Sequence, residues 1–237
     1  MKFWTVEGAL ALMLSKLVEL LRRESELFLG VLDQDPLLGR VIRGEANREQ
    51  YQRFLIGSYQ YVRWSGYLLA KTAMGLDRAG RCLALTRALA EKSTEEGPHD
   101  QWLLRDLRRL GVNIELIKGR QAPAAIEAYV TASSALADRG SPAFLGAAYS
   151  LEYISMHRAG AAAQSLRQQQ HIPEIERCVS FLEGHGHADQ RHIAELEALL
   201  SGLALEPTDE EDIELSARLL RRLYPSFFQG LNQETET

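Results

Sequence analysis

Helical periodicity runs along most of this 237-residue chain and limits its fold more than any other feature. Apolar side chains recur every three or four residues in seven stretches, and no window shows sustained alternation of β-branched residues. We therefore expect an all-α fold without a β-sheet. The predicted helices cover residues 5–31, 47–76, 79–111, 122–139, 142–169, 173–203 and 208–229.

Several of the predicted helix ends have a recognisable cause. Asn47 is a suitable N-cap with Gln50 three residues later, and prolines at 142 and 173 suit the first turn of a helix. Residues 112–121 are predicted to form a polar loop, and residues 232–237 a disordered tail. Because no Ser/Gly/Pro-rich linker divides the rest, we expect residues 1–231 to form a single compact domain of seven helices.

The composition excludes several classes of protein. Hydrophobic residues make up 46% of the chain and charged residues 25%, which is typical of a globular protein with a substantial core. The net charge of −5 argues against nucleic-acid binding. No apolar run approaches the roughly 18 residues of a membrane span. We therefore expect a protein that is not inserted in a membrane. The two cysteines form no CxxC motif or disulfide framework, so we expect a cytoplasmic protein.

Near the end of the chain, His185, Asp189 and His192 are spaced i, i+4 and i+7. On a helix these side chains fall within roughly 60° of one another. Two imidazoles and a carboxylate on one face form half of a metal site. The alternative is a solvated face, but Phe181 and Leu196 indicate a packed helix. His187 is rotated away by about 200° and is left out.

A second pair of candidate ligands lies upstream. Glu96 and His99 are spaced i, i+3, and a Glu-x-x-His pair on one helix is a recurring half of di-iron sites. Pro98 should kink the helix, so Glu95, at i, i+4 from His99, stays an alternative to Glu96. We favour Glu96.

The third candidate is Glu152, which lies alone in an apolar helix, with no other acidic residue between Asp138 and Glu174. A buried carboxylate needs a metal or an ion-pair partner, and Arg158 or another arginine is the alternative partner. Mixed carboxylate and imidazole ligands suit iron or manganese. The complete predicted ligand set is Glu96, His99, Glu152, His185, Asp189 and His192.

Some polar and aromatic residues beside these ligands are candidates for substrate contacts. Tyr59, Arg63 and Tyr149 could line a cavity, with Arg63 holding a carboxylate. Packing in the core, and an ordinary ion pair for Arg63, are the favoured alternatives. Asp106, at i+7 from His99, could hydrogen-bond a ligand histidine or pair with an arginine.

The order of these motifs resembles the haem-oxygenase-like di-iron oxidases, the iron-containing redox enzyme family that is related to the TenA and PqqC folds. The Gly-Pro dipeptide before His99 departs from the family pattern. The resemblance implies a seven-helix haem-oxygenase-like bundle and allows a homodimer. It covers residues 36–203, and the matching segments are residues 36–70, 95–111, 145–152 and 181–192.

The resemblance also implies a chemistry. It predicts two Fe(II) ions, with manganese as an alternative, and O2 as co-substrate, with the six ligands as the catalytic residues. The small-molecule substrate would be an amine, amino acid or fatty acid that undergoes N-oxygenation, oxidative C–C cleavage or desaturation, in natural-product or cofactor biosynthesis. Haem degradation is disfavoured because no histidine precedes His99.

Two other functions stay open for such a chain. One is a cofactor-free TenA- or PqqC-like enzyme, and the other is a non-catalytic metal-binding protein of the same fold. TenA-like thiaminases use a nucleophilic cysteine, and neither Cys82 nor Cys178 lies in a sequence context that suggests one.

Overall fold

The computed structural model describes residues 6–203 and 205–231, with side chains from residue 16 onward except those of 187–190. Within these residues all regular structure is helical, as predicted. None of the described helices is long and apolar enough to cross a membrane. The elements are α1 (Val6–Gln34), α2 (Leu38–Ile42), α3 (Arg48–Val62), α4 (Ser65–Arg78), α5 (Leu83–Glu96), α6 (Asp100–Arg109), α7 (Ile114–Gly119), α8 (Ala124–Asp138), α9 (Phe144–Gln169), the 3-10 turn η1 (Ile175–Arg177), α10 (Ser180–Gly202), α11 (Pro207–Leu223) and η2 (Tyr224–Phe228).

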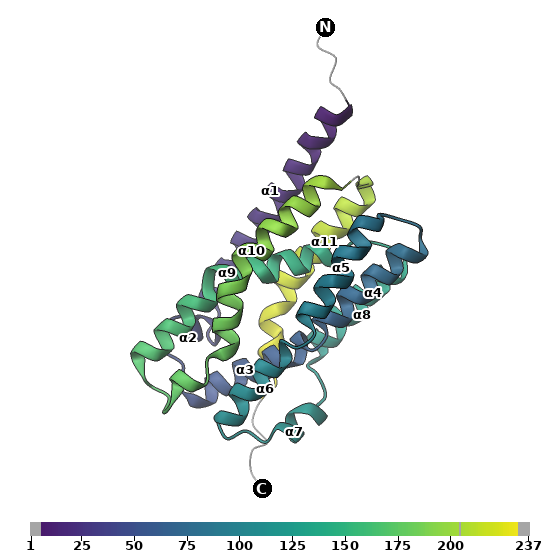
Figure 1. Ribbon diagram of the computed structural model, residues 1–237. Helices are drawn as coiled ribbons and strands as arrows, with labels where there is room; N and C mark the ends of the chain where they lie inside the picture. Colours follow the sequence, from purple (N-terminus) through teal and green to yellow (C-terminus); the bar gives the residue numbers. More distant parts are fainter. Residues whose placement is uncertain (1–5, 204, 232–237) are drawn as a thin grey trace.

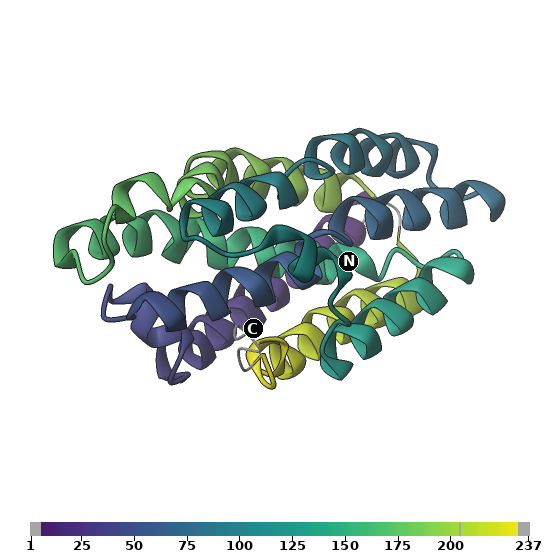
Figure 2. The ribbon, with the colours of Figure 1, turned by 90° about the horizontal axis from the view of Figure 1, so that it is seen from below.

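Helix α9 is the centre of the bundle. It packs against α10 along much of its length and also contacts α1, α2 and α11 (Figure 1). Figure 2 shows α5, α6 and α10 on one side of the molecule and α1, α8 and α11 on the opposite side. One hydrophobic cluster extends from α1 to η2. This arrangement surrounds the middle of α9, where Glu152 lies, with other helices.

Two predicted helices are each divided in two. The prediction of one helix over 79–111 is wrong because α5 ends at Glu96 and α6 begins at Asp100, with Pro98 between them. Proline has no N–H for the helical ladder and clashes with the preceding turn, which accounts for the break. The predicted helix over 47–76 is divided at residues 63–64, where Trp64 N donates to the Tyr61 carbonyl in a tightened turn. Residues 63–64 include no proline or glycine, and the Ser65-Gly66 dipeptide that follows them lies within α4.

Other predicted boundaries also shift. The predicted loop 112–121 contains the short helix α7, whose N-cap Asn113 accepts a hydrogen bond from Glu115 N. The predicted helix from residue 173 begins only at Ser180, after η1. The capping box is confirmed, since Asn47 Oδ1 accepts from Gln50 N at 2.9 Å and Gln50 Oε1 accepts from Asn47 N at 3.0 Å.

A side chain from another helix caps the start of α10. Asp106 of α6 is fully buried and accepts hydrogen bonds from Ser180 Oγ at 2.5 Å and from Phe181 N at 2.9 Å. Burial raises the pKa of this carboxyl, and the hydrogen bonds oppose that change. Neither predicted role for Asp106 matches these contacts. Its carboxylate instead fixes the start of the helix that carries His185 and His192.

Two glycines allow α10 to lie close to its neighbours. A Cβ atom on Gly184 would come within 2.4 Å of the Trp102 ring. A Cβ atom on Gly186 would lie 2.8 Å from the backbone nitrogen of Gly160 on α9. Glycine inside a helix costs about 1 kcal/mol relative to alanine. Here it permits the close contacts that hold His185, between the two glycines, against α6 and α9.

Candidate metal centre

Two sets of possible metal ligands meet between α5, α6, α9 and α10. The donor atoms of Glu96, His99 and His185 lie within 4.8 Å of one another. Those of Glu96, Glu152 and His192 satisfy the same limit. We call these the first and the second half-site. Glu96 belongs to both, so each of its two carboxylate oxygens can face a different set.

The first half-site spans the break between α5 and α6. His99 Nδ1 lies 2.9 Å from Glu96 Oε2, yet this buried nitrogen makes no well-aligned hydrogen bond. The Trp102 ring stacks on His99 with centroids 4.3 Å apart. The two buried atoms therefore converge on the same space without satisfying each other, as expected of metal ligands.

His185 completes the first half-site from α10. Its Nδ1 lies 3.1 Å from the Phe181 carbonyl, which can only accept a hydrogen bond, so Nδ1 carries the proton and Nε2 is left to bind a cation. Burial lowers the pKa of His185, and the neighbouring His99 lowers it further. Both effects favour the neutral imidazole that a metal requires.

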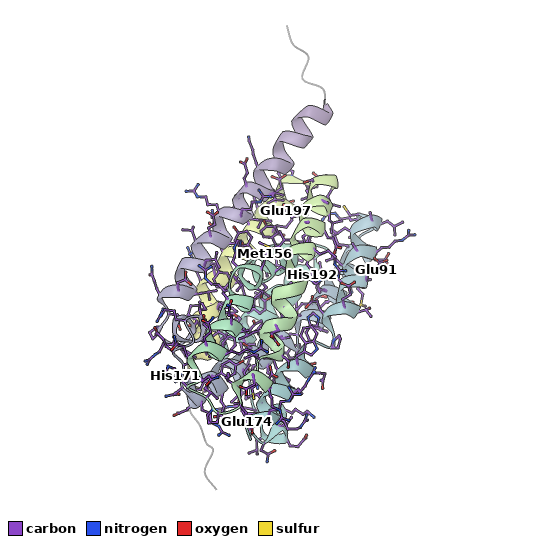
Figure 3. The ribbon with its side chains drawn as sticks, turned by 60° about the vertical axis from the view of Figure 1, so that its left-hand side comes forward. Glu91, Met156, His171, Glu174, His192 and Glu197 are labelled. Carbon is purple, nitrogen blue, oxygen red and sulfur yellow. The ribbon has the colours of Figure 1, made fainter. Side chains whose placement is uncertain are left out.

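The second half-site joins three helices. Glu152 is buried in α9, and its Oε2 lies 3.2 Å from Nδ1 of His192 on α10. Its Oε1 lies 2.7 Å from Nζ of Lys92 on α5. The same ammonium lies 3.5 Å from Glu96 Oε1. Figure 3 shows His192 on the side of α10 that faces α5.

Lys92 is the residue that sequence reasoning missed. The predicted alternative partner of Glu152, Arg158, instead makes a two-pronged ion pair with Asp33, at 2.9 and 2.7 Å. The one available signal was the i, i+4 spacing of Lys92 and Glu96, which describes many exposed helical pairs equally well. The contact with Glu152 depends on how α5 packs beside α9 and has no sequence signature.

Lys92 and Glu96 each favour the charged form of the other. Burial acts to lower the pKa of Lys92, but the carboxylates of Glu152 and Glu96 outweigh it and raise that pKa. Burial and Glu152 act to raise the pKa of Glu96, but His99 and Lys92 outweigh them and the pKa is lowered. Two carboxylates therefore share a single ammonium.

The structure brings together five of the six predicted ligands. Asp189 lies in α10, but its side chain falls outside the described part of the chain. Of the two alternatives on α5, Glu96 points into the centre and Glu95 is exposed. Donor atoms of this kind fit iron or manganese, because they are imidazole nitrogens and carboxylate oxygens.

The three predicted substrate residues lie elsewhere. Tyr59 is buried beside the guanidinium of Arg63, which lies 5.6 Å from its ring. The Tyr149 hydroxyl donates to Glu197 Oε1 at 2.8 Å, and Arg22 holds the same carboxylate. None of the three lines either of the two small cavities described next.

Two small cavities, both partly open to the surface, adjoin the half-sites. The first, of about 50 Å³, is lined by Lys92, Glu96, Glu152 and His185 together with apolar side chains. The second, of about 60 Å³, is mostly apolar and lies between α2, α3 and α9. The two cavities share four lining residues, Tyr61, Ser155, Phe181 and His185.

The comparison with known families assigns most of the chain to one family. Residues 52–224 match the family described as iron-containing redox enzyme, which is well over half of the chain. The chain belongs to this family. It is therefore a member of an iron-dependent oxidoreductase family, and its half-sites offer ligands of the right kind for iron.

Solved structures establish the fold of this family member. A domain of unknown function with a heme oxygenase-like fold from Shewanella denitrificans superposes with a TM-score of 0.74 at 16% identity, covering 87% of this chain and 88% of its own. A TenA homologue from P. horikoshii superposes with a TM-score of 0.70 at 15% sequence identity, covering 90% of this chain and 96% of its own. A TenA homolog from Pseudomonas syringae pv. tomato superposes with a TM-score of 0.67 at 14% sequence identity, covering 88% of this chain and 89% of its own. No curated protein matches the chain. The all-α haem-oxygenase-like fold is thus confirmed.

Proposed function

We propose that this protein is a non-haem di-iron oxidase or oxygenase that uses O2 to oxidise a small substrate. The observation that carries the proposal is the sharing of Glu96 by two three-residue donor sets. A single metal would need only one of them. Membership of the iron-containing redox enzyme family supports iron as the metal.

Each half-site would hold one ion. Glu96, His99 and His185 would hold the first, Glu96, Glu152 and His192 the second, and Asp189 is expected to add a further ligand from α10. When bound, two ferrous ions supply the electrons that reduce O2.

The surrounding residues would orient the ligands and keep water out. The Phe181 carbonyl fixes the tautomer of His185, so that its other ring nitrogen would be available to hold an ion. Trp102 covers one face of His99, and Phe181 packs on the His185 ring with centroids 4.5 Å apart. This apolar cover protects reactive oxygen chemistry from solvent.

The cavities favour a particular shape of substrate. The charged groups lie at one end, and the second cavity continues away from them among side chains such as Leu38, Val41 and Ile154. An amine, amino acid or fatty acid with an aliphatic part would place its polar end near the half-sites. Both cavities are far smaller than the ~300 Å³ of an ordinary ligand pocket, so side chains must move when substrate binds.

Metal analysis of the purified protein tests this proposal. Protein loaded with Fe(II) without oxygen should retain two iron ions per chain. It should then consume O2 in the presence of a substrate from a panel of amines, amino acids and fatty acids. A folded protein that retains no iron above trace would overturn the di-iron proposal.

A failure of that kind would favour a cofactor-free TenA-like enzyme. Such an enzyme of the thiaminase type would use a cysteine thiol as its nucleophile, and that cysteine would have to line the substrate cavity. Neither Cys82 nor Cys178 is among the described residues that line the two small cavities. Their positions therefore give that alternative no support.

A further inference from the structure

Lys92 occupies an unexpected place for a basic residue in a candidate metal centre. Its ammonium contacts Oε1 of Glu96 and Oε1 of Glu152, the two carboxylates of the second half-site. The side chain is only 13% exposed, so it is no surface lysine that reaches inward by chance. Its position is the one that a cation between these oxygens would take.

Charge balance explains why an ammonium lies there. Two neighbouring carboxylates that are removed from water need a compensating cation. In the chain without metal Lys92 supplies it. A divalent ion bound to the same oxygens would supply that charge instead, and it would repel the ammonium at short range.

The first half-site lacks this competitor. The contact between Glu96 and His99 uses Oε2, whereas Lys92 contacts Oε1. The Phe181 carbonyl occupies Nδ1 of His185, which leaves Nε2 of that ring able to bind a cation. The two half-sites therefore differ in whether a cation must leave before metal can bind.

We infer that Lys92 is a built-in counter-ion of the second half-site that must swing out before the second metal ion binds. Metal loading is then ordered, with the first half-site filled before the second. This inference rests on the proposed di-iron function. It assigns to Lys92 a role in positioning and loading, since it would touch metal ligands and not the reacting atoms.

The fold offers the ammonium a place to go. A surface groove of about 400 Å³ lies between α5 and α10, and Lys92 and His192 form part of its lining. The carboxylates of Glu91, Glu95 and Glu195 line the same groove and are exposed. Glu91 and His192 are both labelled in Figure 3. Because Lys92 borders both the groove and the inner cavity, rotation of its flexible stem can exchange the inner carboxylates for the outer ones.

Titration with Co(II), which is stable in air, tests the inference by calorimetry. The wild type should show a tight first step and a second step at least about tenfold weaker. Lys92→Met, which keeps the apolar stem and removes the charge, should tighten the second step about tenfold and leave the first nearly unchanged. A second step that is unchanged or weaker in this variant would overturn the inference.

Two variants serve as matched controls. Lys71→Met removes a lysine from an ion pair with Asp138 that lies away from the centre, and its titration should match the wild type. Lys92→Arg keeps the charge and should keep the second step weak. If Lys92→Met fails to fold even with metal, Lys92→Gln, which keeps a polar end, carries the same expectation.

Thermal unfolding gives a readout that does not depend on the titration. With EDTA present, Lys92→Met should melt below the wild type, because two buried carboxylates have lost their cation. Saturating Co(II) should raise its melting temperature more than that of the wild type. An equal rise in the two proteins would contradict the inference. If the wild type binds no ion in either step of the Co(II) titration, the di-iron proposal itself fails. If instead the two steps have equal affinity and substitution of Lys92 changes neither, only the role of Lys92 is overturned.

Discussion

The two half-sites use the same kinds of ligand but obtain their geometry in different ways. Glu96 and His99 of the first are three residues apart across the α5–α6 break, so local chain geometry brings them together. Glu152 and His192 of the second lie 40 residues apart and meet only because α9 packs against α10. The first also lies under aromatic rings, whereas the second contacts an ammonium. Local structure thus prepares one half, and tertiary packing prepares the other.

The largest expected effect comes from the residue that both halves share. Glu96→Gln removes a carboxylate from each donor set, so both binding steps should weaken by at least about a hundredfold. The matched control is Glu95→Gln, which changes an exposed neighbour. Metal content measured after dialysis should fall to trace in the first variant and stay at the wild-type level in the second. Retention of two ions by Glu96→Gln would mean that Glu96 is not shared.

Histidine substitutions should separate the halves. His99→Ala should abolish the first binding step, whereas His192→Ala should abolish the second and leave the first nearly intact. Each variant should therefore retain one ion per chain, with helicity unchanged by circular dichroism. If either single change abolished both steps, the two sets would form one indivisible site.

A change in helix packing should affect the second half more than the first. Gly186→Ala would place a Cβ atom 2.8 Å from the Gly160 backbone and push α10 from α9. Overpacking of this kind costs about 1–3 kcal/mol, which chemical denaturation measures. Because the second half-site depends on the packing of α10 on α9, the affinity of the second binding step should fall together with the stability. The control is Gly202→Ala, on the same helix but facing open space. This change should alter neither the free energy of unfolding by more than a small amount nor the affinity of the second binding step.

The smallest expected effect concerns the cap that fixes α10. Ser180→Ala removes the hydroxyl that donates to Asp106, while Phe181 N still donates to it. Loss of such a contact costs about 1 kcal/mol, seen as a lower melting temperature. Because His185 and His192 both lie on α10, the two binding steps should weaken together by a similar small factor. A selective loss of one step would show that α10 does not move as a unit.

The sequence predicts what helical periodicity controls. The spacing of His185 and His192 places both on one helix, and both residues lie on α10 and take part in the donor sets. Glu96 and His99 also meet, but across the break between α5 and α6 and not on one helix face. The isolated Glu152 was recognisable because a lone buried carboxylate demands a partner. The identity of that partner, Lys92, depends on a packing contact between helices that no local pattern encodes.

The helix boundaries show the same limit. Pro98 signals the break before α6, although the prediction treated it as a kink, because proline can end a helix or only bend it. The break at Arg63 and Trp64 contains no proline or glycine, and Gly66 lies two residues beyond it inside α4. It follows from how α3 and α4 pack on different neighbours, with α3 against α6 and α4 against α5 and α8.

The paired glycines around His185 limit how far this centre could be moved by protein engineering. A designer who grafts the ligand residues onto another helical bundle would copy the donor atoms but not the distance between the helices. With alanine or larger side chains at 184 and 186, the host helices would stand too far apart for the grafted imidazole to reach its partners. The smallest portable version of the centre therefore includes residues that have no side chain.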